Sequence, residues 1–366
     1  MANILVISAG ILAKGLTSVR EAVGRKSDQP ILEHVRLQAD SQTLAITATN
    51  RTLEISARVS LENMTVFDTT MPAGKLGEII RTLAPDAEVT LRHEGECVTM
   101  TSGRSRFKLN ALDPSGFPIY PAMPNATRHI ITGGVLFGLF SDVTPSMASN
   151  DTRPFSNCAL LDTQNDQIVA VSTDGHRMAL AKSEVQGALM PILIPRDTVA
   201  CVRKHITDSE SEIGLLVSNN HVQFDIGNIT IRSALVDAKY PDYKRVIPSS
   251  HVGTAKVDRG ALLESVKRAK IIAASAKVSS VDLEFSTGKV VLRSCDDASD
   301  EFEETLDAEY TDGPQEIRFQ SQYLIDALEA AAGETITIRL SGDVGATILT
   351  GSGNPDTVFV IMPQRK

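Results

Sequence analysis

One short polar segment, Ser172-Thr173-Asp174-Gly175-His176-Arg177, holds the residue types of a hydrolytic triad. A serine, a histidine and an aspartate can act as nucleophile, general base and orienting acid when the fold brings them together. However, the chain has no G-x-S-x-G nucleophile elbow, the turn that presents such a serine in many hydrolases. We therefore interpret this segment as part of a binding surface, with a triad as the less favoured alternative.

Other patterns that could support catalysis or ligand binding are incomplete. Gly74-Lys75 is not a phosphate-binding loop, because G-x-x-x-x-G-K-[ST] occurs nowhere, and Gly351-Ser352-Gly353 is better explained as a hairpin turn. The seven histidines show no H-x-x-x-H spacing and the four cysteines no C-x-x-C pair. We interpret the acidic run from Asp296 to Glu304 as a solvated loop rather than a cation site. The sequence thus predicts no enzyme activity, no metal and no cofactor.

Length and composition are those of a globular protein of two or three domains. The 366 residues are 42% hydrophobic and 22% charged. No stretch approaches the roughly 20 apolar residues that span a membrane, and scattered cysteines favour a reducing cytoplasm. The net charge of −9 argues against a nucleic-acid partner only if the charges are evenly spread.

The elements that position these residues recur three times, at intervals of roughly 122–125 residues. Apolar residues at helical spacing begin near Ile11, Val135 and Leu262, and second helical segments begin at Pro72, Pro195 and Gln320. Alternating runs typical of half-buried antiparallel strands lie between and after these helices. The turn at Thr49-Asn50-Arg51 also precedes its counterpart Thr173-Asp174-Gly175 by about 124 residues. The sequence predicts three α+β domains, 1–124, 125–249 and 250–366.

Basic residues gather on or beside the predicted helices, while acidic residues concentrate elsewhere, as between Asp296 and Glu309. A basic inner face with an acidic exterior would reconcile the negative total with a DNA partner. The candidates to face DNA are Arg25, Lys75, Arg81, Arg196, Arg203, Lys204, Lys267 and Arg268. The other basic residues on or beside the predicted helices are Lys14, Arg20, Lys26, Arg259 and Lys270. For any single one of them, a solvated helix face is the simpler interpretation. The second helix of the third repeat is an exception, since it carries Asp326 and Glu329 and no basic residue.

Three whole domains in a row can curve towards closure, and head-to-tail pairing of two chains would make a ring of six. In that hypothesis the third repeat of one chain meets the first repeat of the other. Aromatic residues are 4% of the chain and tryptophan is absent, which favours contacts with duplex phosphates over base stacking.

Several segments resemble one family, the bacterial sliding clamp, or beta subunit of DNA polymerase III. The segment 172–179 resembles its T-D-G-H-R-L-A signature, and 240–248 (Tyr-Pro-Asp-Tyr-Lys-Arg-Val-Ile-Pro) resembles its F-P-D-Y-R-R-V-L-P. Residues 151–157 are similar to its D-x-R-Y-x-L-N run, and 358–365 to its Y-V-V-M-P-M-R-L ending. Residues 28–32 resemble the T-L-P-I-L near its start, so the resemblance covers the whole length.

The resemblance implies three clamp domains per protomer and a homodimeric ring, with helices lining the inside and antiparallel sheets outside. It also implies a non-catalytic processivity factor that encircles double-stranded DNA without sequence specificity. Its expected partners are the replicative polymerase catalytic subunit, the clamp loader and repair proteins, bound through short peptide motifs, with no membrane. The peptide pocket implied by the resemblance comprises Arg153, Thr173, Gly175, His176, Arg177, Met178, Pro241, Arg245, Val246, Val344, Val360, Ile361, Met362, Pro363 and Arg365.

Within that pocket, apolar side chains are expected to form the floor and polar ones the rim. The floor is assigned to Met178, Val246, Val344, Val360 and Met362, and the rim to Arg153, His176 and Arg245. The chain departs from the family at Pro154-Phe155-Ser156, which replaces Tyr-Tyr-Leu, and at Gln364, where a methionine is usual. These departures concern partner preference. A repeat-built interaction scaffold that does not encircle DNA is the alternative function.

Overall fold

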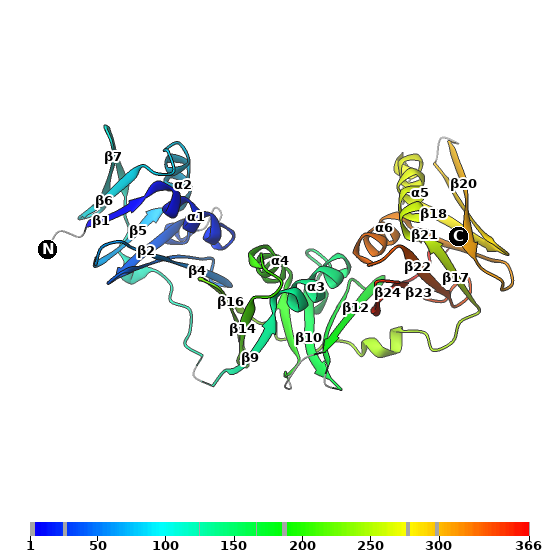
Figure 1. The fold of residues 1–366 in the computed structure, drawn as a ribbon. Helices are drawn as coiled ribbons and strands as arrows, with labels where there is room; N and C mark the ends of the chain where they lie inside the picture. Colours follow the sequence, from blue (N-terminus) through cyan, green and yellow to red (C-terminus); the bar gives the residue numbers. More distant parts are fainter. Residues whose placement is uncertain are drawn as a thin grey trace. The chain divides into compact units, whose positions relative to one another are not determined.

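The structure is a computed structural model that describes residues 4–24, 28–123, 125–165, 167–184, 189–275, 279–296 and 300–365. Arg25, a candidate to face DNA, lies outside the described residues, as do Pro124 at the expected domain boundary and Lys366. Figure 1 shows the course of the chain.

One order of elements, β-α-β-β-β-β-α-β-β-β, occurs three times. In the first repeat the elements are β1 (Ile4–Ser8), α1 (Ala9–Val19), β2 (His34–Asp40), β3 (Thr43–Thr49), β4 (Leu53–Ser60), β5 (Phe67–Pro72), α2 (Ala73–Arg81), β6 (Glu88–Glu94), β7 (Cys97–Ser102) and β8 (Ser105–Asn110). In the second they are β9 (Thr127–Thr132), α3 (Gly133–Val143), β10 (Cys158–Gln164), β11 (Gln167–Thr173), β12 (Arg177–Glu184), β13 (Ile192–Pro195), α4 (Arg196–His205), β14 (Glu212–Val217), β15 (His221–Ile226) and β16 (Ile229–Ala234). In the third they are β17 (Gly253–Asp258), α5 (Arg259–Ile272), β18 (Ser280–Ser286), β19 (Lys289–Cys295), β20 (Glu301–Glu309), β21 (Gln315–Gln320), α6 (Ser321–Ala330), β22 (Thr335–Leu340), β23 (Thr347–Gly351) and β24 (Asn354–Ile361). The predicted threefold α+β repeat is confirmed.

Short 3₁₀ turns connect these elements: η1 (Arg20–Ala22), η2 (Pro30–Glu33), η3 (Pro114–Gly116), η4 (Thr144–Ser146), η5 (Pro154–Asn157), η6 (Tyr243–Val246) and η7 (Ala273–Ser275). The second helices begin one residue after the positions that the sequence predicts, because Pro72, Pro195 and Gln320 end the preceding strands. Capping accounts for other starts: Ser8 Oγ accepts a hydrogen bond from the Ile11 amide at the start of α1.

Equivalent turns in the first two repeats use the same hydrogen bonds. Thr49 Oγ1 donates to the Leu53 carbonyl at 3.1 Å and accepts from the Arg51 amide at 3.0 Å. In the second repeat, Thr173 Oγ1 donates to the Arg177 carbonyl at 2.7 Å and accepts from the Gly175 amide at 3.0 Å. The correspondence predicted between these segments is therefore confirmed at the level of single hydrogen bonds.

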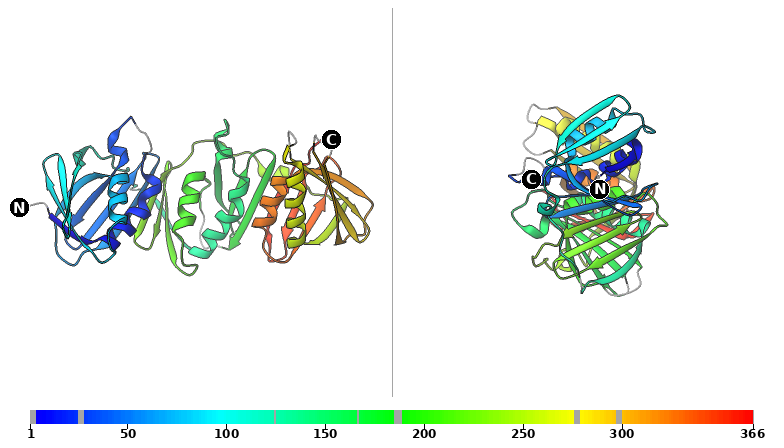
Figure 2. Two further views of the ribbon diagram at one scale, coloured as in Figure 1. Left: turned by 90° about the horizontal axis from the view of Figure 1, so that it is seen from above. Right: turned by 90° about the vertical axis from the view of Figure 1, so that its left-hand side faces the viewer.

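The chain forms two compact units, each with its own core. One comprises Met1–Gly134 with Cys201–Leu235, and the other Val135–Ala200 with Val236–Lys366. In the first unit, α1 and α2 lie side by side and pack through buried residues such as Leu12, Leu16 and Leu76. In the second unit, α5 and α6 pack together in the same way (Figure 2).

Sheets continue from one repeat into the next by antiparallel strand pairing. In the first unit, β4 pairs with β16 inside an eight-stranded sheet of order β5-β2-β3-β4-β16-β15-β14-β9; we call this the first junction. In the second unit, β12 pairs with β24 inside a twelve-stranded sheet of order β13-β10-β11-β12-β24-β23-β22-β17-β20-β19-β18-β21; we call this the second junction. Each junction joins the fourth strand of one repeat to the eighth strand of the following repeat.

The acidic run needs a correction. We predicted a solvated loop from Asp296 to Glu304; residues 297–299 lie outside the described residues, and Glu301–Glu309 forms strand β20, which pairs with β19 from Glu301 to Asp307. Its alternating burial, with Phe302 and Leu306 half-buried and Glu301, Glu303 and Asp307 exposed, explains the strand. The hairpin turn predicted at 351–353 is confirmed between β23 and β24.

Candidate functional site

The turn between β11 and β12 holds several of the residues assigned to the peptide pocket. The Asp174 carboxylate accepts hydrogen bonds from the amides of His176 and Arg177 at 2.9 and 3.0 Å. Gly175 has a φ of +87°, a backbone conformation that strains any other residue. Ser172 is buried and donates its hydroxyl hydrogen to the Val143 carbonyl. These contacts build a rigid turn and do not form the relay of a triad.

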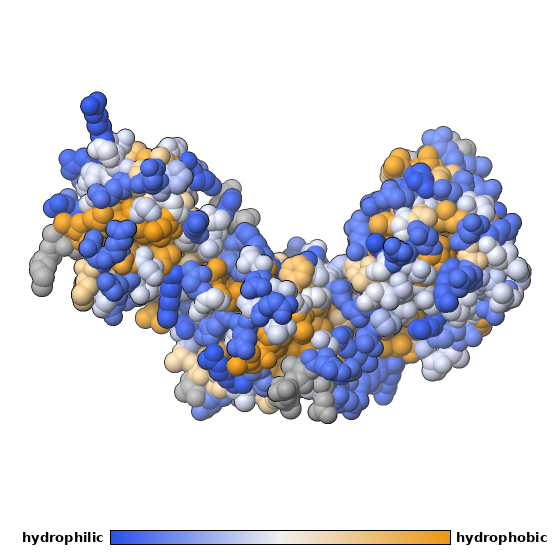
Figure 3. Space-filling view, viewed as in Figure 1, coloured by the Kyte–Doolittle hydropathy of each residue, from blue (hydrophilic) through white to orange (hydrophobic). Residues whose placement is uncertain are grey.

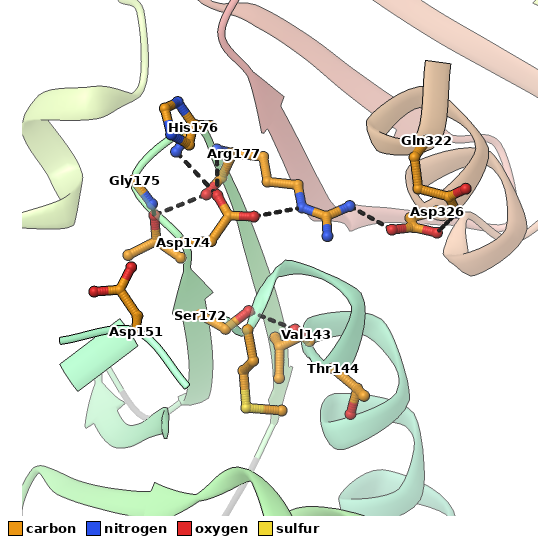
Figure 4. A network of polar contacts seen from close by, with 12 residues as sticks. Val143, Thr144, Asp151, Ser172, Asp174, Gly175, His176, Arg177, Gln322 and Asp326 are labelled. Carbon is orange, nitrogen blue, oxygen red and sulfur yellow. Dashed lines mark hydrogen bonds and ion pairs between the residues drawn. The ribbon is translucent and has the colours of Figure 1, made fainter. Parts of the chain in front are cut away.

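Arg177 joins this turn to helix α6 (Figure 4). Its Nε donates to Asp174 at 2.9 Å and its Nη1 donates to Asp326 at 2.5 Å. The guanidinium also lies over the Tyr323 ring, 4.4 Å from its centroid. With only 12% of its side chain exposed, Arg177 fixes the position of its neighbours and does not offer a free donor at the rim.

The ring of Tyr323 also stacks on His176, with centroids 6.4 Å apart. Burial raises the pKa of Tyr323. Tyr323 and Asp326 are site residues that the sequence analysis did not assign. The sequence did contain one signal, because this helix carries acidic residues and no basic one. The ion pair of Asp326 with Arg177 gives the acidic side chain its role.

Arg153 lies on the other side of the turn. It pairs with Asp151 at 2.7 Å, donates to the Asp174 carbonyl at 2.9 Å and covers the Phe155 ring. Hydrogen bonds from Arg153 lower the pKa of Asp151 to about 2. A Cβ atom at Gly175 would lie 2.6 Å from the Arg153 guanidinium, so the glycine permits this close packing. Arg153 keeps an exposed guanidinium edge and fits the rim that we predicted.

A cluster of buried apolar residues lies beneath this surface, on one face of the twelve-stranded sheet. This apolar cluster comprises Cys158, Leu160, Val169, Val171, Met178, Leu180, Leu193, Tyr243, Ala346, Ile348 and Val360. Phe155, Tyr240 and Ile247 pack against it. Ser156 is fully buried, so where the family has a leucine this chain offers no exposed side chain.

The predicted floor is only partly available to a ligand. Met178, Val360 and Ile361 are buried because β12 and β24 are adjacent strands inside the sheet, so little of these side chains is exposed. Val246, Val344 and Met362 are instead exposed, by 44%, 72% and 41%. On the face seen in Figure 3, hydrophobic patches are bordered by hydrophilic surface.

The remaining pocket residues lie on loops and on the short turn η6. Pro241 and Arg365 are exposed, Pro363 is half-buried, and Arg245 is exposed and pairs with Asp242 at 2.9 Å. The Met362 amide donates to the His176 carbonyl at 2.9 Å, which holds the C-terminal segment against the turn. A backbone hydrogen bond therefore joins two segments of the predicted pocket.

The predicted DNA-facing residues divide into two groups. Lys75 and Arg81 on α2 are exposed and have no charged partner among the described residues. Most of the others have partners. Lys204 pairs with Glu21, and Lys267 pairs with Glu264 and Glu329. Arg268 pairs with Glu304 at 2.8 Å, and Arg203 also interacts with another residue.

Arg196, another residue of the predicted DNA-facing set, has backbone partners. Its Nη1 donates to the carbonyls of Thr144 and Met147, at 3.4 and 2.5 Å. The carbonyls that follow a helix end need donors, and Arg196 supplies one after α3.

Among the described residues no group of three or more histidine, cysteine, aspartate or glutamate side chains could hold a metal ion, and the four cysteines are free. No helix in the described part of the chain is long and apolar enough to cross a membrane.

Comparison with known proteins identifies the family. Family models of the DNA polymerase III beta subunit match three successive stretches: its N-terminal domain at 4–121, its central domain at 131–242 and its C-terminal domain at 244–365. The beta sliding clamp of Pseudomonas aeruginosa is 30% identical over 358 residues, which is 97% of each chain. That of Escherichia coli K12 is 29% identical over the same length.

Solved structures agree with the sequence comparisons. The crystal structure of the DNA polymerase III subunit beta from Pseudomonas aeruginosa has a TM-score of 0.95 at 30% identity, covering 99% of this chain and 100% of that one. A sliding clamp from the same organism bound to griselimycin has a TM-score of 0.96 at 29% identity, with both chains fully covered. The chain belongs to the DNA polymerase III beta subunit family, the beta sliding clamps.

Proposed function

We propose that this protein encircles duplex DNA as a head-to-tail homodimer, without sequence specificity, and tethers the replicative polymerase, the clamp loader and repair proteins through short peptide motifs. As a family member it is a processivity factor and not an enzyme. We place it in the cytoplasm, in keeping with its four free cysteines.

The observation that carries the proposal is the rule by which the repeats join. The fourth strand of the first repeat, β4, pairs with the eighth strand of the second, β16, and β12 pairs with β24 by the same rule. The next fourth strand is β20, and the eighth strand of a first repeat is β8. A pairing of β20 with β8 of a second copy would follow the same rule and close a ring by symmetry. We call this pairing the closing junction.

Within the described residues, β8 and most of β20 have one edge that pairs with no other strand. β8 is the last strand of its sheet and pairs with β7 alone, and β20 pairs with β17 only at Ala308 and Glu309. Unpaired strand edges accept another chain readily, because their amides and carbonyls lack partners.

Equivalent registers give the pairing of individual residues. Cys295 pairs with Glu301 at the end of the β19–β20 hairpin, as Thr49 pairs with Glu54 at the end of β3–β4. β7–β8 and β15–β16 are hairpins of equal length, so Lys108 corresponds to Arg232.

Because Glu54 lies opposite Arg232 in the first junction, Glu301 would lie opposite Lys108 in this closing junction. Two residues along, Glu303 would face Arg106, and Phe302 would face Phe107 between them. The first junction supplies a precedent, since Arg232 and Glu54 form an ion pair at 3.1 Å. Opposite charges and paired aromatic rings directly across an antiparallel pair each stabilise it by roughly 0.2–1 kcal/mol.

Charge exchange across the closing junction tests the proposal. We expect Arg106→Glu with Lys108→Glu to weaken the dimer, because like charges would then face each other. Glu301→Lys with Glu303→Arg should do the same. All four substitutions in one chain should restore dimerisation, as measured by sedimentation equilibrium. If the fourfold variant is as monomeric as either double variant, the register is wrong; if the double variants stay dimeric, the junction lies elsewhere.

The peptide-docking surface is proposed on the exposed Val246, Val344 and Met362, rimmed by Arg153, His176 and Arg245. Apolar side chains over a rigid sheet suit an apolar anchor of a bound peptide, and methionine adapts to several ligands. Griselimycin is a usable probe, because a related clamp has been solved with it. Met362→Asp should abolish its binding in calorimetry and leave the dimer intact; unchanged binding would move the docking surface elsewhere.

A further inference from the structure

A chain of hydrogen bonds runs from helix α5 to the turn between β11 and β12. The Lys270 ammonium on α5 donates to Gln322 Oε1 on α6 at 2.5 Å, and Gln322 Nε2 donates to Asp326 Oδ1 at 2.5 Å. The other carboxylate oxygen of Asp326 accepts from Arg177, whose Nε donates to Asp174 (Figure 4). We call these five residues the Arg177 network.

Each side chain of the Arg177 network has a fixed role as donor or acceptor. A lysine ammonium can only donate and an ionised carboxylate can only accept, so the Gln322 amide turns its oxygen to Lys270 and its nitrogen to Asp326. All five residues are half-buried. Hydrogen bonds that are partly shielded from water polarise one another, so the loss of one bond weakens the next.

The network ends at residues of the proposed docking surface. The Asp174 carboxylate also accepts hydrogen bonds from the amides of His176 and Arg177, which fix the turn. The His176 carbonyl in turn accepts from the Met362 amide at 2.9 Å. His176 belongs to the proposed rim and Met362 to the apolar side chains, so the order of both depends on this turn.

A neighbouring cation of α5 lies outside the network. Lys267 pairs with the carboxylates of Glu264 and Glu329, at 3.4 and 3.1 Å. Lys270 differs because its partner is an amide that continues to Asp326. Two lysines of one helix therefore allow a matched comparison.

The equivalent positions at the first junction cannot form such a network. Leu53 is the first residue of β4 as Arg177 is of β12, and Cys201 and Asp326 are both the sixth residue of a ten-residue helix. Leu53 and Cys201 are buried. A leucine and a thiol cannot make the ion pair that joins turn and helix in the second unit. The network thus belongs to the junction where the docking surface is proposed.

We propose that Lys270 and Gln322 are positioning residues for peptide docking. Neither side chain belongs to the docking surface. Together they hold Asp326, and through it Arg177 and the turn, in the conformation that binds a peptide. The inference rests on the proposed docking surface and extends its support to helix α5.

Calorimetric titration of the full-length protein with griselimycin tests the proposal. Gln322→Met keeps the length of the side chain but loses both hydrogen bonds, and should lower the affinity roughly threefold. Lys270→Met loses one bond, farther from the turn, and should lower it roughly twofold. Lys270→Arg keeps a donor and should retain the affinity. Lys267→Met removes a charge from the same helix outside the network, and this matched control should bind like the unsubstituted protein.

A double-mutant cycle separates positioning from a general effect on helix packing. In the Asp326→Ala variant the network is already broken, so adding Gln322→Met or Lys270→Met should cause no further loss of affinity. Side chains that only support the packing of α5 against α6 would instead give losses that add.

The outcomes separate the inference from the proposed function. Additive losses in the cycle, an equal loss in Lys267→Met, or unchanged affinity in both network variants overturns the inference and leaves the docking surface in place. An unsubstituted protein that does not bind griselimycin overturns the proposed docking surface and the inference with it. Urea titration verifies that each variant is folded, and either network variant alone is sufficient for the cycle.

Discussion

The first and second junctions pair equivalent strands, but the side chains that face each other across the two junctions differ in polarity. Glu54 and Met178 hold equivalent positions on β4 and β12; Glu54 faces Arg232, whereas Met178 faces Val360. The first junction thus has a partly buried ion pair and the second an apolar pair in a larger cluster. Strand pairing therefore supplies the joint in both cases, whatever side chains face each other across it.

A charge placed in the second junction should have the greatest effect. Val360 is buried in the apolar cluster with no polar partner, so Val360→Asp would bury an unpaired carboxylate. We expect a loss of at least about 4 kcal/mol in the free energy of unfolding, measured by urea titration. A loss below about 1 kcal/mol would show that the second junction admits water, against the packing described.

Arg232→Ala should have an intermediate effect on the first junction. It leaves Glu54 buried without its partner, which costs about 1–3 kcal/mol; the 35% exposure of Arg232 keeps the loss below that of a fully buried pair.

The double substitution Glu54→Met with Arg232→Val gives the first junction the same two apolar side chains that face each other in the second junction. Replacing a buried pair with packed apolar residues is often neutral, so the same urea titration should recover most of the loss. A double variant weaker than Arg232→Ala would mean that the ion pair itself specifies the first junction.

Asp326→Ala tests how the second junction supports ligand docking. Without Asp326, Arg177 keeps its ion pair with Asp174 and its contact with the Tyr323 ring but loses its ion pair with α6, so the turn at Gly175 and His176 should become less ordered. We expect griselimycin affinity to fall by roughly five- to tenfold, about 1 kcal/mol, in calorimetry. Glu329→Ala, on the same helix but paired with Lys267, is the control. Equal losses in both variants would indicate a general effect on α6.

The smallest effects concern pH, and they have opposite signs at the two junctions. Burial raises the pKa of Glu54 above its unfolded value, so Glu54 lowers stability as pH rises through its folded pKa. The stability of Glu54→Gln relative to the unsubstituted protein should therefore fall as pH falls from 7 to 4.

Asp151 behaves in the opposite way beside the second junction. Its pKa is lowered to about 2, so its contribution is present above the unfolded pKa of about 3.9 and is lost as pH falls towards 2. The effect of Asp151→Asn on thermal unfolding should be constant from pH 7 to 5 and vanish near pH 2. An effect that persists at pH 2 would contradict the assigned partnership with Arg153.

Local patterns in the sequence were sufficient for the repeat, its helices and the Thr49 and Thr173 turns, because these depend on residues a few positions apart. The partners of cations were not predictable in this way. Lys204 meets Glu21 from far along the chain, and Arg177 meets Asp326 on a different repeat. The burial of Val360 likewise follows from the pairing of β24 with β12, a long-range contact that spacing does not reveal.

Size-exclusion chromatography with in-line X-ray scattering, at near-physiological salt, tests the central claim of a closed head-to-tail dimer most directly. We predict a mass of twice the 39.4 kDa protomer and a scattering profile that requires a central hole. A single protomer that persists at high concentration, or a dimer whose profile excludes a hole, would contradict the ring and favour an interaction scaffold that does not encircle DNA.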